Sequence, residues 1–307
     1  MSSSQPASMM SLRVQIPFWV CTLIWGTTWI VIRDQLGVVP PSWSVTYRFL
    51  VAGSAMFAWA AWSRLPLTLG KEGQRLALLF GLAQFTLNFN FVYRAEEHIT
   101  SGLVALLFAL LIVPNTLFAW LFLGQKAGAR FFAGAAVAMG GIALLFVQEY
   151  RTSGGGSAIG LGIVLTLCGV LSASAANILQ ATDSARRLPM ASLLAWGMLW
   201  GTFFNAVWAA ATVGPPVVEL RLTYLAGVLH LGLLASAVAF MAYFSVIRAV
   251  GPGPAAYSGI ITPVIAMALS TLFEGYRWSF LAAAGGLLAL AGLAIALTAR
   301  RPEAKSG

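Results

Sequence analysis

Apolar residues occur along this chain in long, nearly unbroken runs, and most charged residues fall between them. Each run is long enough to cross roughly 30 Å of hydrocarbon as a helix that rises about 1.5 Å per residue. The ten runs lie at about 17–33, 43–63, 75–93, 103–123, 130–147, 158–181, 192–212, 224–247, 254–273 and 278–299. A transmembrane β-barrel would instead alternate apolar and polar positions. The pattern therefore predicts an all-α integral membrane protein with ten transmembrane helices.

One pattern occurs twice in these runs, 149 positions apart. In the first copy Pro114 lies inside an apolar run, and eleven residues later the run ends at Gly124-Gln125. In the second copy Pro263 precedes Glu274-Gly275 by the same spacing. Glycine-spaced apolar segments follow both copies, with Gly134 and Gly140 after the first and Gly286 and Gly292 after the second. The chain is therefore expected to contain an internal repeat.

The two halves of the chain meet near its middle. Residues 151–157, Arg-Thr-Ser-Gly-Gly-Gly-Ser, have the composition of a flexible linker. We expect a first five-helix repeat at 1–150 and a second at 158–307. Because five is an odd number, the second copy must enter the membrane in the opposite sense. Inverted repeats of this kind let a transporter build one substrate site that opens alternately to either side.

The composition agrees with a membrane protein. Hydrophobic residues make up 59% of the chain, charged residues 9%, and the mean hydropathy is +0.85. Soluble domains hold roughly 25% charged residues. Residues 1–16 are polar with a lone Arg13, and no small-residue cleavage pattern follows the first apolar run, so we expect an uncleaved first helix rather than a removed signal peptide.

The 18 Lys and Arg outnumber the 9 Asp and Glu and are distributed unevenly. Twelve of them fall in the two terminal segments and the even-numbered connections, against five in the odd-numbered connections. Cytoplasmic loops of membrane proteins are enriched in Lys and Arg. We therefore expect a multi-pass inner-membrane protein with both termini in the cytoplasm, and the basic charge reflects this topology rather than a nucleic-acid partner.

Two further motifs carry a family resemblance. Trp25-Gly26-Thr27-Thr28-Trp29 in the first predicted helix and Tyr47-Arg48-Phe49 in the second, together with the two proline-containing copies, resemble ten-helix, EamA-type members of the drug/metabolite transporter superfamily. The resemblance covers nearly the whole chain and extends more loosely to the YddG-type amino-acid exporters. It implies an exporter of small metabolites or drugs. Gln125 stands where the family often has an acid, so no charged role is implied at that position.

The two prolines are candidate gating residues. Pro114 and Pro263 each free one backbone carbonyl, which lipid cannot satisfy. The fourth and ninth predicted helices could bend there as gates, or the prolines could be static kinks. Gly102 and Gly251 precede the same two helices and could provide flexible entries to them.

The third predicted helix holds the candidate substrate site. Gln84 and Asn88 are four residues apart and share a helix face, Phe91 continues that face, and Asn90 lies to one side. Such amides could bind a substrate without a buried charge, or they could clamp neighbouring helices by hydrogen bonds. Residues from other helices that could join the site are Trp25, Trp29, Asn115, Asn177, Tyr243, Tyr257 and Ser258. Neutral amides beside aromatic rings favour amphipathic small molecules, including aromatic and apolar amino acids.

Ionisable residues are rare inside the predicted helices. Only Arg48 and His230 qualify, and each could have either a packing role or a functional one. No Asp or Glu lies in mid-membrane, so we expect alternating access without a buried carboxylate for proton coupling.

Other functional classes find little support in the sequence. It contains no H-E-x-x-H, G-x-S-x-G or P-loop motif, so we expect no catalytic residue, metal or cofactor. The expected partners are the lipid bilayer and a small-molecule substrate, and no oligomer is implied. We expect an exporter of small metabolites, with amino acids as the favoured substrates. A drug or other metabolite exporter of the same superfamily is the alternative, followed by a channel.

Overall fold

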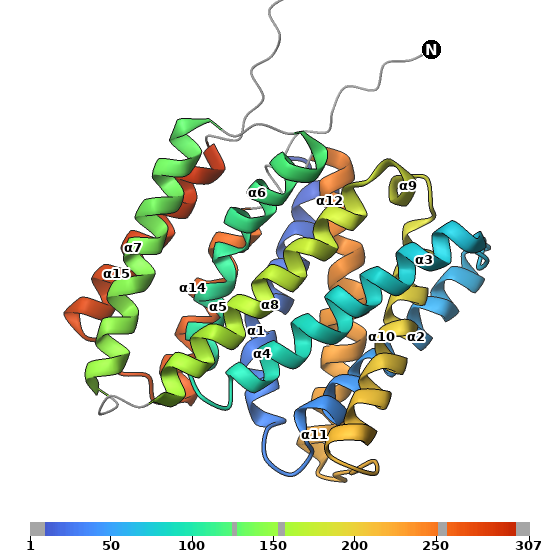
Figure 1. Ribbon diagram of the computed structural model, residues 1–307, viewed down its shortest axis with the longest axis horizontal. Coiled ribbons are helices and arrows are strands. Elements are labelled where there is room, and N and C mark those ends of the chain that lie inside the picture. Colours follow the sequence, from blue (N-terminus) through green and yellow to red (C-terminus); the bar gives the residue numbers. More distant parts are fainter. Residues whose placement is uncertain (1–9, 125–127, 153–156, 251–256, 299–307) are drawn as a thin grey trace, which may run out of the picture.

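The computed structural model is a bundle of helices (Figure 1). The structure describes residues 10–124, 128–152, 157–250 and 257–298, and within these ranges it contains no strand. The predicted linker lies mostly outside them: its first two residues continue one helix, and Ser157 begins the next. The all-α prediction is confirmed for the described part of the chain.

The helical segments follow the predicted runs closely. In chain order they are α1 (Leu12–Asp34), α2 (Pro41–Trp62), α3 (Gly70–Phe80), η1 (Gly81–Asn88), α4 (Phe89–Ala95), α5 (Ser101–Phe108), η2 (Ala109–Leu111), α6 (Ile112–Leu123), α7 (Ala129–Thr152), α8 (Ser157–Ala181), α9 (Asp183–Arg186), α10 (Met190–Thr212), α11 (Leu222–Leu229), η3 (His230–Val238), α12 (Ala239–Val250), α14 (Ser258–Phe273) and α15 (Phe280–Thr298).

Seven helices among the described residues are long and apolar enough to cross a membrane, and two shorter apolar helices lie at Ser258–Phe273 and Phe280–Ala296. Helix α2 has 22 residues and carries Arg48, and it is not one of these seven. The structure therefore supports a multi-span membrane protein, whereas the number of ten spans stays a prediction.

Helices from the two halves of the chain pack in pairs. Helix α7 lies along α15 at one edge of the bundle, and α2 lies along α10 at the other (Figure 1). Between them, α1 contacts α12 and α14, and α8 contacts α4 and α6. Helix α5 also packs against α14. The amides predicted for the site, Gln84, Asn88 and Asn90, are buried in this bundle.

Glycines bring α7 and α15 into close contact. A Cβ atom at Gly141 would lie 2.3 Å from the backbone nitrogen of Ala289, and one at Gly292 would lie 2.3 Å from that of Ala138. Small residues let membrane helices approach closely in this way. Of the glycines in the repeat pattern, Gly134 and Gly292 lie in this contact, whereas a Cβ at Gly140 would meet nothing within 4 Å. Gly141 and Gly285, which neighbour Gly140 and Gly286, complete the contact.

The two proline-containing copies end alike but bend differently. Gly124 ends α6 with a φ of 67°, and Gly275 follows Glu274 with a φ of 70°, a left-handed conformation that favours glycine. Pro114 is the third residue of α6, directly after the 3-10 turn η2. Helix α14, in contrast, continues through Pro263. The helix is therefore interrupted beside the first proline and not at the second.

Two π-helical segments were not predicted from the sequence. Segment η1 begins at Gly81 within the third predicted helix, and η3 begins at His230 within the eighth. Their starting points are 149 positions apart, which is the spacing of the two prolines. Such segments are rare and frequently occur at functional sites.

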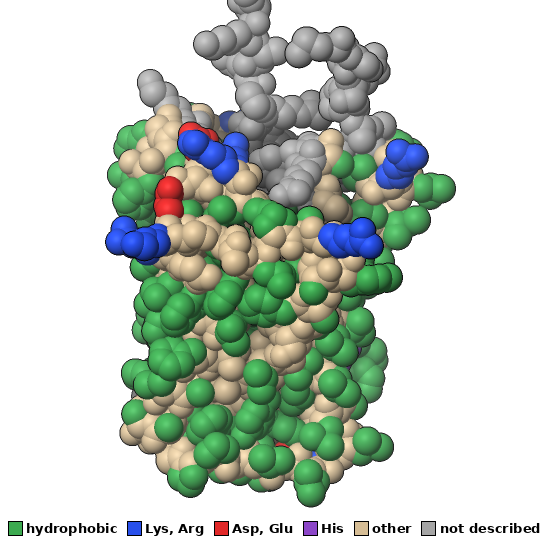
Figure 2. Space-filling model, turned by 90° about the vertical axis from the view of Figure 1, so that its right-hand side faces the viewer, with side chains coloured by type: hydrophobic (Ala, Val, Ile, Leu, Met, Phe, Trp, Pro, Cys, Tyr) green, Lys and Arg blue, Asp and Glu red, His purple; other side chains and the backbone are tan. Residues whose placement is uncertain are grey.

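The outer surface matches a membrane environment. Figure 2 shows the face on the right of Figure 1, where apolar side chains cover most of the surface and Lys and Arg gather towards one end. Helix α3 begins at that end (Figure 1). The exposed apolar residues include Trp59, Leu79 and Phe203, each between 47% and 54% exposed.

Candidate functional site

The three amides of the third predicted helix all point into the bundle. Gln84 and Asn88 lie in η1 and are 7% and 2% exposed, and Asn90 lies in α4 and is 8% exposed. A buried amide needs hydrogen-bond partners or leaves an unpaired polar atom. The partners therefore decide between the clamping and binding roles.

Asn90 has the contacts of a clamp. Its Nδ2 donates to Asn205 Oδ1 on α10 (2.6 Å) and to the backbone oxygen of Thr86 (2.9 Å). Its Oδ1 accepts from Ser42 Oγ on α2 (2.8 Å). Asn205 Nδ2 in turn donates to the backbone oxygen of Phe85 (2.9 Å). This amide joins α2, α4 and α10 and has little capacity left for a substrate.

Asn88 has a different environment. Its Oδ1 is buried and has no hydrogen-bond partner among the described residues. A Cβ atom placed at Gly169 of α8 would lie 3.4 Å from this oxygen and 3.5 Å from Cβ of Phe91. Asn88 and Phe91 therefore share the face that meets α8, as the sequence predicted. An unpaired buried acceptor costs about 1–3 kcal/mol, which a ligand donor would recover.

Another pair of amides lies further along α8. Asn177 Nδ2 of α8 donates to Asn115 Oδ1 of α6, at 3.3 Å. Asn177 is eight residues beyond Gly169, which corresponds to about 12 Å along a helix. Helix α8 packs against η1, α4 and α6, so it places these amides along one interior surface.

Two of the aromatic candidates, Trp25 and Trp29, lie in α1. Trp25 packs against Tyr243 with a centroid distance of 5.0 Å, and its Nε1 donates to the backbone oxygen of Ala235 in η3 (3.1 Å). Trp29 packs against Phe108 of α5 at 5.5 Å, and its Nε1 is buried without a partner among the described residues. Trp29 thus presents a second unpaired polar atom inside the bundle.

The remaining predicted residues have less central positions. Tyr257 is 39% exposed at the start of α14, while Ser258 beside it is 3% exposed. Gly102 allows α5 and α14 to touch, since a Cβ there would lie 2.7 Å from Met267 Sδ and 2.9 Å from Ser270 Cβ. A flexible entry at this glycine stays a prediction. Gly251 lies outside the described residues.

Arg48 is anchored inside the bundle. It is 1% exposed, and its Nε donates to Ser236 Oγ of η3 (3.1 Å). Its guanidinium lies 4.2 Å from the centroid of the Phe89 ring, a cation–π contact. These contacts attach α2 to η3 and α4. His230, the other intramembrane candidate, is half-buried, and its Nε2 lies 3.4 Å from Thr27 Oγ1.

A cluster of polar side chains joins several helix ends at the end of the bundle where α1 ends and α5 begins. The Glu274 carboxylate accepts from the backbone nitrogen of Ser101 (3.2 Å), from Ser101 Oγ (2.9 Å) and from Ser270 Oγ. Arg33 Nε lies 3.7 Å from Glu274 Oε1. We call Arg33, Ser101, Ser270 and Glu274 the outer cluster.

Glu96 lies beside the outer cluster and is fully buried. Arg33 Nη1 donates to its backbone oxygen, but neither carboxylate oxygen of Glu96 has a hydrogen-bond partner among the described residues. Burial raises the pKa of this carboxyl well above its usual range and Glu274 raises it further, whereas Arg33 and Arg48 oppose the shift. The sequence did not indicate this buried carboxyl group, because Glu96 lies three residues beyond the predicted run 75–93 and looks interfacial; only the fold covers it. Glu96 directly follows the span Gly70–Ala95, so it is not an acid in mid-membrane, and the expected absence of a carboxylate for proton coupling stays a prediction.

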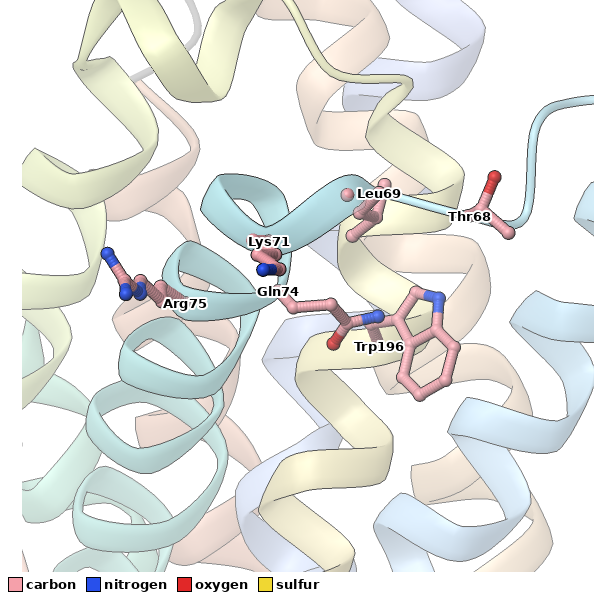
Figure 3. A pocket seen from close by; sticks show the side chains of 7 residues that line it. Thr68, Leu69, Lys71, Gln74, Arg75 and Trp196 are labelled. Atoms are coloured by element: carbon pink, nitrogen blue, oxygen red, sulfur yellow. The ribbon is translucent and has the colours of Figure 1, made fainter.

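A groove of about 550 Å³ opens at the opposite end of the third predicted helix (Figure 3). It is lined by Thr68, Leu69, Gly70, Lys71, Gln74, Arg75 and Trp196. Gln84, the first of the buried amides, lies nine residues beyond Arg75 in the same helical segment, or about 14 Å along the helix. The groove is therefore separate from the buried amides.

Long apolar helices with buried polar side chains between them define a polytopic helical membrane protein. The EamA-like transporter family model matches residues 16–147 and again residues 160–298. This chain belongs to that family and hence to the drug/metabolite transporter superfamily.

Similar proteins include several transporters. Protein PagO of Salmonella typhimurium is 26% identical over 282 residues, covering 88% of each chain. The uncharacterized inner membrane transporter YedA of Escherichia coli is 28% identical over 82% of this chain and 80% of its own. A probable amino-acid metabolite efflux pump of Escherichia coli is 24% identical over 89% of this chain and 91% of its own. A crystal structure at 19% identity matches with a TM-score of 0.69 over 94% of this chain and 99% of that chain, and it shows the fold alone.

Proposed function

We propose that this protein exports small metabolites, most of all amino acids with aromatic or apolar side chains, by alternating access across the inner membrane. In this proposal ten helices form two inverted five-helix repeats, and both termini lie in the cytoplasm. The end of the bundle that holds Glu96 and the outer cluster faces outwards. The end with Lys71 and Arg75 then faces the cytoplasm, in keeping with the enrichment of basic residues on that side.

Three observations support the inverted repeat. The family model matches each half of the chain separately. The two π-helical segments begin 149 positions apart. The α7–α15 contact pairs glycines reciprocally: a Cβ at Gly134 would meet the backbone oxygen of Gly292 at 2.7 Å, and one at Gly141 would meet that of Gly285 at 2.5 Å. A two-fold axis within the membrane would relate these two contacts.

The unpaired Oδ1 of Asn88 is the observation that carries the substrate proposal. An ammonium or amide group of a substrate could donate to it, while Phe91 and Trp29 offer apolar surface for a side chain. Asn115 and Asn177 lie further along α8 and are available for a carboxyl or amide group. Neutral recognition suits a zwitterion, whose opposite charges nearly balance. The relative named as a probable amino-acid metabolite efflux pump agrees with this class.

The gating roles follow from the same proposal. The 3-10 turn beside Pro114 gives the fourth predicted helix a point at which to bend, and Pro263 leaves one carbonyl of α14 without its helical donor. Gly102 lets α5 and α14 close against each other at the outer end. Gly251 would be its counterpart at the cytoplasmic end. Closing one end while opening the other would alternate access to the amides.

The experiment is transport by the purified protein in liposomes, using labelled amino acids, nucleobases, sugars and cationic dyes. We expect saturable uptake of one or more amino acids. Asn88→Leu should lower that uptake at least tenfold, without changing the thermal unfolding midpoint by more than a few degrees. Saturable uptake of dyes alone would favour the drug-exporter alternative, and flux that never saturates would favour a channel. Unchanged amino-acid uptake in Asn88→Leu would remove this residue from the site.

A further inference from the structure

Glu96 is a buried carboxyl group to which the proposed transport cycle assigns no role. Its carboxyl group is 0% exposed, and both oxygens lack hydrogen-bond partners among the described residues. A buried carboxylate that stays ionised needs a paired cation or several donors. The groups around it show whether such a partner is present.

Arg33 and Arg48 are the two cations whose charges act on Glu96, and both make other contacts. Arg33, from the end of α1, donates to the backbone oxygen of Glu96 and places its Nε 3.7 Å from Glu274. Arg48, from α2, donates its Nε to Ser236 and lies over the Phe89 ring, and its Nη1 is buried without a hydrogen-bond partner among the described residues. Neither arginine forms an ion pair with the Glu96 carboxylate among the described residues.

The other charged or titratable neighbours disfavour an anion at Glu96. Glu274, from the end of α14, is a second carboxylate, and it takes the hydrogen bonds of Ser101 and Ser270. Tyr93, one turn earlier in α4, donates its hydroxyl to Gln35 Oε1 (3.0 Å) and not to Glu96. Of the two acids, Glu274 has the donors and Glu96 has none. A shared proton would therefore reside on Glu96.

We propose that Glu96 binds a proton when the outer end of the bundle closes, and that external pH thereby sets the balance between the closed and open outer end. Closure forms one O–H bond, between a Glu96 carboxyl oxygen and a proton taken from external water. Opening hydrates the carboxyl group and returns the proton to that water. The inference rests on the proposed alternating-access function, because it needs an outer end that opens and closes.

The sign of the pH effect follows from the burial. With Glu96 fully buried, the structure corresponds to the closed outer end, and burial raises the Glu96 pKa there. Hydration in the open form returns the pKa towards its usual range, so the closed form binds more protons at pH values between the two pKa values. Acidification through this window favours closure, and a rise in pH favours opening. For a single proton, the ratio of the two forms changes by at most tenfold per pH unit.

The test measures the opening directly. Nitroxide labels at Val38→Cys, in the connection after α1, and Leu272→Cys, near the end of α14, span the outer end, and both residues are well exposed in the structure. Cys21 and Cys168 are first replaced by alanine. Double electron–electron resonance then gives the distance between the two labels in lipid nanodiscs from pH 5 to pH 8. Three proteins are compared: the labelled protein that keeps Glu96 and Glu97, which is the native background, and the same protein with Glu96→Gln or with Glu97→Gln. Glu97 is the exposed neighbour, so its variant controls for loss of one outer charge.

We expect a longer distance to gain population with rising pH in the native background and in Glu97→Gln, by threefold or more per pH unit near the midpoint. Glu96→Gln should keep the shorter distance at every pH. An equal pH response in Glu96→Gln, or no response in the native background, would overturn the proposal. If Glu96→Gln does not fold, the infrared spectrum of the native protein at pH 7 replaces this test. The proposal predicts the band of a protonated carboxyl group, and the absence of that band would count against it. Saturable transport in liposomes is measured in parallel with the native protein. If transport occurs but the label distance does not depend on pH, the proton-binding role of Glu96 is wrong and the proposed transport function stands.

Discussion

The contact between α7 and α15 allows a sharp test of the packing. Gly141 and Gly140 are adjacent in α7, yet a Cβ at Gly141 would lie 2.3 Å from the Ala289 nitrogen and one at Gly140 would meet nothing within 4 Å. Gly141→Ala therefore forces the helices apart, whereas Gly140→Ala adds a methyl group on an open surface. The two substitutions make the same chemical change one residue apart.

The magnitude follows from the distances. Ordinary contact for a Cβ begins at 3.4 Å, so α7 and α15 must separate locally by about 1 Å in Gly141→Ala. Overpacking of a tight interface costs about 1–3 kcal/mol. Replacing glycine by alanine within a helix favours the helix by up to about 1 kcal/mol, and this gain is common to both variants. We therefore expect Gly141→Ala to be less stable than Gly140→Ala by about 1–3 kcal/mol, the overpacking cost alone.

Thermal unfolding of the purified protein in detergent, followed by loss of the monodisperse size-exclusion peak, measures this difference. Gly285→Ala should repeat the effect from the other helix, since a Cβ there would lie 2.7 Å from the Gly141 oxygen, and Gly286→Ala is its control. Equal unfolding midpoints for Gly141→Ala and Gly140→Ala would refute the close approach of these helices.

The remaining predictions concern the clamp, the prolines and the topology. Asn90→Leu should reduce the yield of folded protein, because it removes the partner of Asn205 Oδ1 and the acceptor of the Ser42 hydroxyl, at about 1–3 kcal/mol for each buried group. A normal yield with lost transport would instead make Asn90 a binding residue. Pro114→Ala and Pro263→Ala each restore a backbone hydrogen bond worth about 0.5–1.5 kcal/mol. They should change the reactivity of interior cysteines towards a thiol reagent about threefold to tenfold, one variant from outside and the other from the cytoplasm. Wild-type reactivity in both variants would make the prolines static kinks. A cysteine at Glu97 should react with an impermeant thiol reagent on intact cells and one at Lys71 only after permeabilisation, and the reverse result would invert the proposed orientation.

The sequence predicts the helices well because a membrane span needs a long apolar run, and that signal is local. The segment Ser101–Leu123, for example, lies within two residues of its predicted limits. The π-helical segments η1 and η3 were missed, because one extra residue per turn leaves no mark on an apolar pattern. The glycine repeat shows which helices hold small residues but not which face meets a partner, so it does not separate Gly141 from its neighbour Gly140.

The candidate site was predicted less completely. Burial of Gln84, Asn88 and Asn90 follows from the cost of exposing amides to lipid. Which amide is already satisfied depends on Asn205, 115 residues further along the chain, so spacing within one helix cannot decide it. Glu96 was missed for a similar reason, because its burial comes from helices distant in sequence.

Counterflow tests the central claim most directly. Liposomes that contain the purified protein and a high internal concentration of an unlabelled amino acid are placed in a trace of the same amino acid with a label. A carrier with alternating access returns inwards loaded with label, so the internal label should rise transiently above its equilibrium value and then fall. A channel has no step that exchanges internal for external substrate. A monotonic approach to equilibrium for every amino acid tested, without an overshoot, would contradict the account.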